Sequence, residues 1–370
     1  MTTLAHRTRV LIVDDSVVMR RLLSEAIASD PDMEVVGYAA NGRIALALMD
    51  QVAPDLVTLD VEMPVMDGLA TLKAMRAAGH RLPIIMFSTL TERGAEATID
   101  ALALGASDYV AKPAGTGDYT DARERIREAL IPQIKALCRG ASLRPLSQPA
   151  SFRKETLPHK KWAEPVNLVV IGSSTGGPNA LAQLLPNLPP DFPVPVLIVQ
   201  HMPPAFTRFL AQRLTGLCQL PVEEAEEGAA LRSGKILVAP GGYHLAVKGR
   251  EPQIRTHITQ EAPENSCRPS VDVLFRSAAQ SLAGRALGVV LTGMGQDGLR
   301  GCGALAAAGG EIVVQDEASS VVWGMPGFVA REGLADAVLP IAEVGPHIVQ
   351  RVLTRRALAG AHRSAAAVAP

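Results

Sequence analysis

The fold of the second half of this chain is decided by the stretch Val166-Asn-Leu-Val-Val-Ile-Gly-Ser-Ser-Thr-Gly-Gly-Pro178. Its apolar run predicts a strand, its Ser/Gly-rich segment predicts a turn, and the residues after the turn predict a helix. A strand, turn and helix in this order suit two chemistries, because the turn either lifts a nucleophilic hydroxyl above a parallel sheet or holds a phosphate at the helix N-terminus. The stretch by itself does not decide between the two.

Two later strand ends favour the nucleophile. They are Val196-Leu-Ile-Val-Gln-His201 and Leu287-Gly-Val-Val-Leu-Thr-Gly-Met-Gly-Gln-Asp297. Ligand-binding residues of an open parallel sheet lie beyond the carboxyl ends of its strands, so we expect His201 and Asp297 on the same sheet edge as the serine. A serine, a histidine and an aspartate on one edge are the components of acyl-transfer catalysis.

Each of these residues has an alternative interpretation. A lone histidine after an apolar strand is more often structural, and Asp297 in Gly-Gln-Asp-Gly fits ordinary turn chemistry. The conjunction of three strand ends at one crevice favours a triad of Ser174, His201 and Asp297, because a triad is recognised by geometry rather than by chain order. The residues alone leave other candidates open: Ser173 or Thr175 for the hydroxyl, His244 for the base and Asp316 for the acid.

Length and composition set the broad class of the protein. A chain of 370 residues with 48% hydrophobic content predicts two domains with buried cores. The 36 lysines and arginines against 37 acidic residues give no excess positive charge, so neither nucleic acid nor an acidic membrane surface is an expected partner. The 4 cysteines show no CxxC spacing, and no signal peptide or spanning apolar run is apparent, which indicates a cytoplasmic protein with free thiols.

Both predicted domains are of the α/β class. Residues 1–138 alternate short apolar strands with helical patterns, which predicts a flavodoxin-like (βα)5 domain. We expect a polar linker over 139–165, a doubly wound parallel α/β domain over 166–356 and a disordered Ala-rich tail over 357–370. The strands expected in the first domain are Arg9–Asp14, Glu34–Tyr38, Asp55–Asp60, Pro83–Ser88 and Asp108–Lys112.

An acidic cluster follows the strands of the first domain. Asp14 and Asp15 end the first strand and Asp60 ends the third, so their carboxylates are expected to converge. Such a dense negative site is costly unless a hard cation neutralises it, and Mg²⁺ with carboxylate and water oxygens fits. Ser88 and Lys112 follow the fourth and fifth strands, where a hydroxyl and an ammonium would serve a phosphoryl group on Asp60.

Nearly all of residues 8–130 resemble a two-component response-regulator receiver. The resemblance rests on Asp-Asp-Ser after the first strand, Leu-Asp-Val-Glu-Met-Pro-Val-Met-Asp-Gly around the third strand end, and Tyr-Val-Ala-Lys-Pro near the end of the domain. It implies the following roles: Asp60 as phosphoacceptor, Asp14 and Asp15 with Asp60 as the Mg²⁺ site, and Ser88, Tyr109 and Lys112 as the conformational relay.

Residues 166 to about 345 resemble the catalytic domain of the chemotaxis protein-glutamate methylesterases, the CheB family. The motifs are Ile-Gly-Ser-Ser-Thr-Gly-Gly-Pro, Gln-His-Met-Pro-Pro-Ala-Phe-Thr, Ala-Pro-Gly-Gly-Tyr-His, Arg-Pro-Ser-Val-Asp-Val-Leu-Phe, Leu-Thr-Gly-Met-Gly-Gln-Asp-Gly and Gln-Asp-Glu-Ala-Ser-Ser-Val-Val-Trp-Gly-Met-Pro. The chain departs from the family pattern at Ser173, where alanine is expected. The resemblance implies Ser174 as nucleophile, His201 as base, Asp297 as the residue that orients the base, and the backbone N–H groups of Met294 and Thr175 as the oxyanion hole.

The resemblance also implies a reaction and its partners. The substrate is a glutamate γ-methyl ester on the cytoplasmic signalling region of chemoreceptors, and glutamine deamidation is a second expected activity. A histidine kinase of the CheA type would phosphorylate the receiver, which needs Mg²⁺, whereas no cofactor is expected in the esterase site. We expect the unphosphorylated receiver to cover the crevice that holds Ser174, with the linker as hinge.

Two functions of other classes compete with this interpretation. One is a phosphorylation-dependent adaptor whose second domain binds a ligand without turnover. The other is a receiver joined to a DNA-binding effector, which would need a compact basic helix-turn-helix module. Residues 166–345 instead show several strand ends and Gly-rich turns, so the DNA-binding function is disfavoured.

Overall fold

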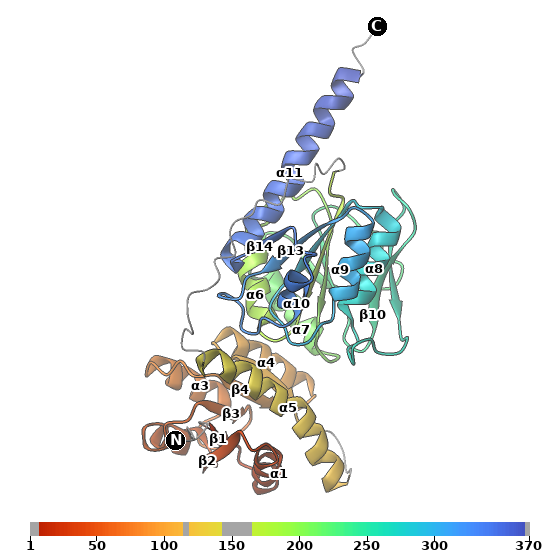
Figure 1. The fold of residues 1–370 in the computed structure, drawn as a ribbon. Helices are drawn as coiled ribbons and strands as arrows, with labels where there is room; N and C mark the ends of the chain where they lie inside the picture. Colours follow the sequence, from red (N-terminus) through yellow and green to blue (C-terminus); the bar gives the residue numbers. More distant parts are fainter. Residues whose placement is uncertain (1–6, 114–117, 143–164, 367–370) are drawn as a thin grey trace, which may run out of the picture. The chain divides into compact units, whose positions relative to one another are not determined.

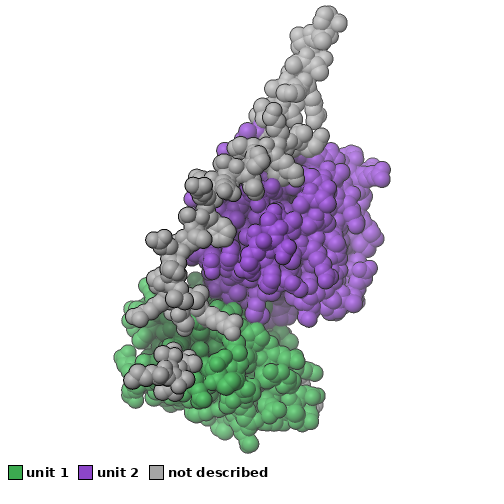
Figure 2. Space-filling model, in the orientation of Figure 1, with its two compact units in different colours: residues 1–149 green, residues 150–370 purple. Residues whose placement is uncertain are grey.

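The computed structural model describes residues 7–113, 118–142 and 165–366. The chain divides into two compact units, residues 1–149 and 150–370, which are coloured separately in Figure 2. Each unit has its own parallel sheet. The division falls inside the segment 139–165 that the sequence predicts as a linker, and residues 143–164 of that segment lie outside the described residues.

The first unit is built on a five-stranded parallel sheet with strand order β2-β1-β3-β4-β5. This order confirms the predicted flavodoxin-like (βα)5 fold. Its strands are β1 (Thr8–Val13), β2 (Met33–Ala39), β3 (Leu56–Asp60), β4 (Ile84–Ser88) and β5 (Asp108–Ala111). Its helices are α1 (Val17–Ala28), α2 (Gly42–Val52), α3 (Gly68–Ala77), α4 (Glu92–Ala103) and α5 (Tyr119–Ser142).

Polar residues at the starts of the helices fix the loops that carry the predicted phosphorylation site. The side chains of Ser16, Asn41, Asp67 and Thr91 each accept a hydrogen bond from a backbone N–H in the first turn of α1, α2, α3 and α4. Strands β3 and β4 are buried along their whole length, as expected for central strands with helices on both faces. The residues at their carboxyl ends therefore stand on a rigid edge.

The second unit is built on a seven-stranded parallel sheet with strand order β14-β13-β12-β6-β7-β9-β8. Its strands are β6 (Leu168–Ser173), β7 (Val196–Gln200), β8 (Val222–Glu224), β9 (Ile236–Val238), β12 (Ala286–Val290), β13 (Glu311–Gln315) and β14 (Ala337–Leu339). A separate antiparallel hairpin consists of β10 (His244–Lys248) and β11 (Arg255–Thr259). Its helical segments are α6 (Gly177–Leu184), η1 (Leu185–Asn187), α7 (Phe206–Thr215), α8 (Val271–Leu282), α9 (Leu299–Ala307), α10 (Met325–Arg331) and α11 (Ile341–Ala366).

Strand β6 lies at the point where the strand order of this sheet reverses. It pairs with β7 on one side and with β12 on the other, and all three strands are buried throughout. Figure 1 shows α8 and α9 packed side by side, and α6 packed beside α11. A reversal of strand order opens a crevice beyond the carboxyl ends of the strands, so the fold places a binding site where β6, β7 and β12 end.

Helix ends differ from the sequence prediction in two places. The sequence predicts a disordered tail over 357–370, but α11 continues to Ala366, and residues 367–370 lie outside the described residues. Alanine has the highest helix propensity, so an Ala-rich segment extends a helix whose first turns pack on the sheet. Helix α5 likewise continues to Ser142, four residues into the predicted linker. None of the helices within the described ranges is both long and apolar enough to cross a membrane.

Candidate active site

The turn after β6 holds the backbone of Ser174 in place. Its N–H donates to the carbonyl of Thr292 at 3.1 Å, and its carbonyl accepts hydrogen bonds from the N–H of Gly177 at 2.8 Å and from Nε2 of Gln200 at 2.9 Å. Gln200 is the last residue of β7, and Thr292 follows β12. The two strands beside β6 therefore both position the serine.

The two adjacent serines have different surroundings. Ser173 is fully buried, and its hydroxyl donates to Oε1 of Gln200 at 2.7 Å. Ser174 is only partly buried, and its hydroxyl makes no hydrogen bond to any residue that the structure describes. Of the two hydroxyls, that of Ser174 is the one without a hydrogen bond to the described residues, which favours it as the nucleophile, and its role stays a prediction.

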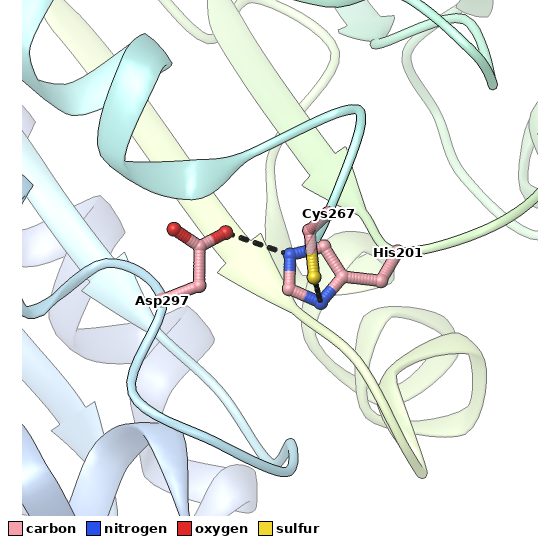
Figure 3. A group of neighbouring side chains, drawn as sticks. All are labelled: His201, Cys267 and Asp297. Atoms are coloured by element: carbon pink, nitrogen blue, oxygen red, sulfur yellow. Dashed lines mark hydrogen bonds and ion pairs between the residues drawn. The ribbon is translucent and has the colours of Figure 1, made fainter. Parts of the chain in front are cut away.

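His201 and Asp297 form a close pair. Nε2 of His201 lies 2.8 Å from Oδ2 of Asp297. A dashed line marks this contact in Figure 3. The other ring nitrogen, Nδ1, faces Sγ of Cys267 at 3.6 Å. His201 follows β7 directly, and its N–H donates to the carbonyl of Ser173 at 3.1 Å, so the imidazole is anchored beside the turn that carries Ser174.

Asp297 is held by a dense set of hydrogen-bond donors, three of which lie at the start of α8. It accepts from the backbone N–H groups of Val271, Asp272 and Gly298, from the hydroxyl of Ser270 and from the side-chain amide of Asn265. Burial acts to raise the pKa of this carboxyl, but the hydrogen bond and charge of His201 and the donors of α8 outweigh burial and lower the pKa to about 2. Asp297 is therefore ionised at neutral pH.

The imidazole of His201 is correspondingly made more basic. Burial acts to lower its pKa, but the hydrogen bonds with Asp297 and Cys267 raise the pKa to about 9. An ionised carboxylate on one ring nitrogen favours the imidazolium that forms when the ring takes a proton. The pair is thus suited to general-base catalysis by His201.

The alternative base His244 and the alternative acid Asp316 both make hydrogen bonds that hold the local fold together. His244 is buried, with the N–H of Ser270 donating to its Nδ1 at 3.2 Å and its Nε2 lying 3.1 Å from the carbonyl of Ala262. Asp316 accepts hydrogen bonds from the N–H and the hydroxyl of Ser319 at 3.0 and 2.6 Å. Both ring nitrogens of His244 are occupied, and Asp316 has no histidine among its partners within the described residues, which favours His201 and Asp297.

A glycine-containing loop passes directly against the serine. A β-carbon at Gly293 would lie only 2.8 Å from Cβ of Ser174, so this close approach requires glycine. The carbonyl of Gly293 accepts from the N–H groups of Gly324 and Met325, which fixes the loop. The N–H of the next residue, Met294, makes no hydrogen bond within the described part of the chain. A backbone donor is therefore available close to Ser174.

Thr175 is the other residue predicted to contribute to the oxyanion hole. It is buried directly after Ser174, and its carbonyl accepts a hydrogen bond from the hydroxyl of Thr292 at 3.0 Å. The turn that carries its backbone N–H is thereby tied to the loop before Asp297. The oxyanion roles of Met294 and Thr175 stay predictions.

The predicted acidic cluster converges in the first unit. Potential ligand atoms of Asp14, Asp15 and Asp60 lie within 4.8 Å of one another. Nζ of Lys112 lies 3.0 Å from Asp14 and 2.8 Å from Asp60. Burial raises the pKa of Asp60 to about 6, with the charge of Asp14 acting in the same direction and the hydrogen bond from Lys112 acting against it. Three carboxylates against one ammonium leave negative charge that suits a divalent cation with oxygen ligands.

The predicted relay residues lie on the neighbouring strands β4 and β5. The buried hydroxyl of Ser88 donates to the carbonyl of Gly94 in α4 at 3.0 Å, and the carbonyl of Ser88 accepts from the N–H of Lys112 at 2.6 Å. Tyr109 stands opposite Met86 in the strand register, and burial raises its pKa well above the ordinary value. Ser88 thus connects the strand end beside the predicted phosphorylation site to α4, whereas the relay itself stays a prediction.

Three residues beside the triad were not expected from the sequence: Gln200, Asn265 and Cys267. Asn265 and Ser266 have φ angles of 51° and 62°, in the left-handed region that residues other than glycine rarely adopt. This conformation carries Cys267 to the imidazole. Two features of the sequence could have pointed to these residues: Gln200 directly precedes His201, and asparagine, as at position 265, tolerates a left-handed backbone. Both features are common in proteins and do not by themselves indicate a site.

Comparison with known proteins finds relatives for both units of the chain. Residues 169–348 match the family model described as CheB methylesterase, and residues 10–124 match that of the response regulator receiver domain. The chain is 53% identical over 353 residues to a protein-glutamate methylesterase/protein-glutamine glutaminase of Nocardioides sp., a match that covers 94% of this chain and 96% of that protein. An enzyme of the same name from Trichodesmium erythraeum is 51% identical over 348 residues, covering 93% of this chain and 99% of that protein. The crystal structure of the Thermotoga maritima CheB methylesterase catalytic domain matches with a TM-score of 0.49 and 40% identity, covering 50% of this chain and 98% of that one.

Proposed function

The chain belongs to the family of CheB methylesterases with a receiver domain and is a protein-glutamate methylesterase/protein-glutamine glutaminase, and we propose that its chemistry is carried by Ser174, His201 and Asp297. The observation that carries this proposal is the 2.8 Å contact between His201 and Asp297 on the strands that flank β6. This contact joins the proposed base to the proposed acid, and Ser174, which follows β6, would be the nucleophile. The bond between Ser173 and Gln200 supports Ser174 over its neighbour.

The path of the proton follows from which imidazole nitrogen the aspartate occupies. Nε2 donates to Asp297, so Nδ1 is the nitrogen with a free electron pair when the ring is neutral. Nδ1 would take the proton of Ser174 as its oxygen attacks the γ-carbonyl of a glutamate methyl ester. The imidazolium then gives that proton to the departing methoxide, methanol leaves, and water hydrolyses the acyl-enzyme by the same route.

Deamidation of glutamine uses the same groups with a poorer leaving group. The amide nitrogen must be protonated before it departs, and His201 is the acid that can do this. The raised pKa of His201 favours the protonated form and so assists this step. Ammonia replaces methanol as the first product, and the acyl-enzyme is the same in both reactions.

The backbone N–H groups of Met294 and Thr175 would stabilise the oxyanion of the tetrahedral intermediate. The support is the position of the loop, since Gly293 touches Ser174 and the N–H of Met294 is not used within the described residues. Removing one such donor costs about 2.7–4 kcal/mol in comparable enzymes. A fixed backbone donor here would therefore account for a rate factor of about 100 to 1,000.

The first unit would control the esterase through phosphorylation of Asp60. A Mg²⁺ ion held by Asp14, Asp15 and Asp60 would supply the charge neutralisation that phosphoryl transfer requires. Lys112, which contacts both buried carboxylates, positions the acceptor and neutralises part of the phosphoryl charge. Ser88 and Tyr109 would then transmit the phosphorylation of Asp60 to α4. The hydroxyl of Ser88 would break its hydrogen bond to the carbonyl of Gly94 when it turns to the phosphoryl group.

The partners follow from the family. As a response regulator that acts on chemoreceptor glutamates, the protein requires a receptor as substrate and a kinase as phosphodonor. We infer that the kinase is of the CheA type and that the reaction occurs in the cytoplasm, where receptors of this kind expose their signalling helices. The absence of excess positive charge disfavours nucleic acid as a partner.

Release of methanol from a methylated receptor, and of ammonia from one with glutamine at the same sites, tests this function. We expect His201→Gln to reduce both by at least about 1,000-fold, because triad members act as a unit. His257→Gln is the matched control, since His257 lies on β11 with Lys248 and Glu227 as its partners. Normal turnover by His201→Gln would contradict the proposed function.

A further inference from the structure

We propose that Cys267 and His201 form a binding site for Zn²⁺, and that this cation inhibits the esterase. Sγ of Cys267 lies 3.6 Å from Nδ1 of His201, and the two side chains point toward each other in Figure 3. Potential ligand atoms of His201, Cys267 and Asp297 all lie within 4.8 Å of one another. Thiolate and imidazole are the ligands that zinc prefers in proteins, in contrast to the carboxylates of the first unit.

The distance between the two ligand atoms suits a tetrahedral site. With a Zn–S bond of about 2.3 Å and a Zn–N bond of about 2.05 Å, tetrahedral geometry separates sulfur and nitrogen by about 3.6 Å. The observed separation of Sγ and Nδ1 is 3.6 Å, which equals the separation that a tetrahedral site requires. Both residues are partly exposed, which leaves the remaining coordination positions open to water.

The surroundings orient the imidazole for such a cation. A histidine that binds a metal with one nitrogen usually donates its other N–H to a carboxylate, which fixes the ring and its tautomer. Asp297 occupies Nε2 at 2.8 Å and is itself held by backbone N–H groups, so Nδ1 presents its electron pair toward Cys267. Asp297 thus has the role of a supporting residue in this site rather than that of a third ligand.

The thiol is held in place by a tight turn. The N–H of Cys267 donates to the carbonyl of Glu264 at 2.8 Å, and the N–H of Glu264 donates to the carbonyl of Cys267 at 3.1 Å. Asn265, inside this turn, donates through its amide to both Asp297 and Asp272 at 3.0 Å. The loop that delivers the sulfur is therefore tied to the same carboxylate that orients the imidazole.

The other thiols lack these properties. Burial raises the pKa of Cys138 to about 12 and that of Cys218 to about 11, and it raises that of Cys302 as well, all of which opposes the thiolate that zinc needs. Within the described residues, Cys267 is the cysteine that belongs to a group of potential metal ligands. Cys218 is also partly exposed and thus provides a matched control.

Inhibition follows from the position of the cation. Binding replaces the proton of the thiol, which is released to solvent, and occupies the electron pair of Nδ1. That electron pair is the one that takes the proton of Ser174, so hydrolysis stops while zinc is bound. This consequence rests on the proposed function of His201, whereas the binding site itself does not.

The test uses the full-length chain without phosphodonor and measures zinc binding and methanol release separately. Equilibrium dialysis with Zn²⁺ gives the dissociation constant, and Co²⁺ in its place gives a thiolate-to-metal absorption band if sulfur is a ligand. We expect Cys267→Ser to raise the dissociation constant and the inhibition constant at least tenfold and to abolish the band. Cys218→Ser should change each constant less than twofold.

The two measurements keep the site and the function distinguishable. Failure of the wild-type chain to bind Zn²⁺ at micromolar concentration, or equal binding by Cys267→Ser, would overturn the proposed site. Zinc bound through Cys267 with full methanol release would overturn inhibition and would also count against His201 as the base. A circular dichroism spectrum of each variant checks that the second unit is folded.

Discussion

Nε2 of His201 lies 2.8 Å from Oδ2 of Asp297, although the two residues follow strands that do not pair with each other. Strand β6 separates β7 from β12, so the contact passes over the carboxyl end of β6, the strand that Ser174 follows. Three neighbouring strands thus each contribute one residue at the point of strand-order reversal. The sheet topology, more than any local motif, assembles this site.

Asp297→Asn should reduce turnover by about 10,000-fold while the protein stays folded, because an amide neither fixes the tautomer of His201 nor stabilises its charged form. Asp316→Asn is the matched control and should retain most activity. Asp316 accepts hydrogen bonds from the N–H and the hydroxyl of Ser319 through Oδ1, which the oxygen of an asparagine can also accept. Equal turnover of the two variants in the methanol assay would show that Asp297 has no special role.

The same pair predicts a pH dependence. Asp297 raises the pKa of His201, and the base is active only when deprotonated, so wild-type kcat/KM should rise with pH through a limb above the ordinary histidine value of about 6.5. In Asp297→Asn the lost negative charge lowers this pKa, and the limb of the residual activity should move to lower pH. Movement to higher pH would contradict the assigned contact.

Gly293→Ala should impair catalysis by displacing the serine. Its β-carbon would lie 2.5 Å from Sδ of Met325 and 2.8 Å from Cβ of Ser174, so the loop must shift, at a cost of about 1–3 kcal/mol. We expect a fall in kcat of at least tenfold, measured well below the melting temperature, together with a melting temperature lowered by about 2–4 °C for each kcal/mol. Gly303→Ala in α9, where an added β-carbon meets nothing within 4 Å, should leave kcat unchanged. Unaltered kcat in Gly293→Ala would mean that this loop does not position Ser174.

Asp60→Asn should prevent acceptance of a phosphoryl group, because an amide cannot form the acyl phosphate. Asp15→Asn should instead weaken Mg²⁺ binding by removing one negative charge. Both variants should keep basal esterase activity. The measurement is incorporation of labelled phosphate from a small phosphodonor with Mg²⁺ present, and labelling of Asp60→Asn at the wild-type level would show that the acceptor lies elsewhere.

A fragment of residues 161–370 should have higher basal activity than the intact unphosphorylated chain if the receiver mainly covers the crevice. Phosphorylation should activate the intact chain and leave the fragment unchanged, because the fragment lacks Asp60. Each unit has its own sheet, so the fragment is expected to fold, and circular dichroism checks this. A folded fragment that is slower than the intact chain would show that the receiver assists the esterase site instead of covering it.

Much of the fold was predictable because buried parallel strands read as continuous apolar runs. The five strands predicted in the first domain agree with the observed strands to within one residue at each end. The strand before Ser174 was expected from the same kind of apolar run, and the structure has it over Leu168–Ser173. The family resemblance also selected Ser174 from its neighbour, and the hydrogen bond of Ser173 to Gln200 supplies a physical reason for that choice.

The position of Cys267 and the end of α11 depend on tertiary contacts, which a local sequence pattern does not indicate. Cys267 reaches His201 because Asn265 and Ser266 adopt left-handed backbone, and neither residue type requires that conformation. Helix α11 extends to Ala366 because alanine continues a helix that buried Val344, Ile348 and Val352 anchor, whereas composition alone suggested a tail without structure.

The most direct measurement of the central claim is the site of covalent labelling by a serine-reactive phosphonate probe, located by mass spectrometry. We expect the label on Ser174 in the wild-type chain and in Ser173→Ala, at similar rates, and we expect none on Ser174→Ala. His201→Gln should slow labelling strongly, because the probe reacts with the activated hydroxyl. Labelling of Ser174→Ala at the wild-type rate, or a label located on Ser173, would contradict Ser174 as the nucleophile.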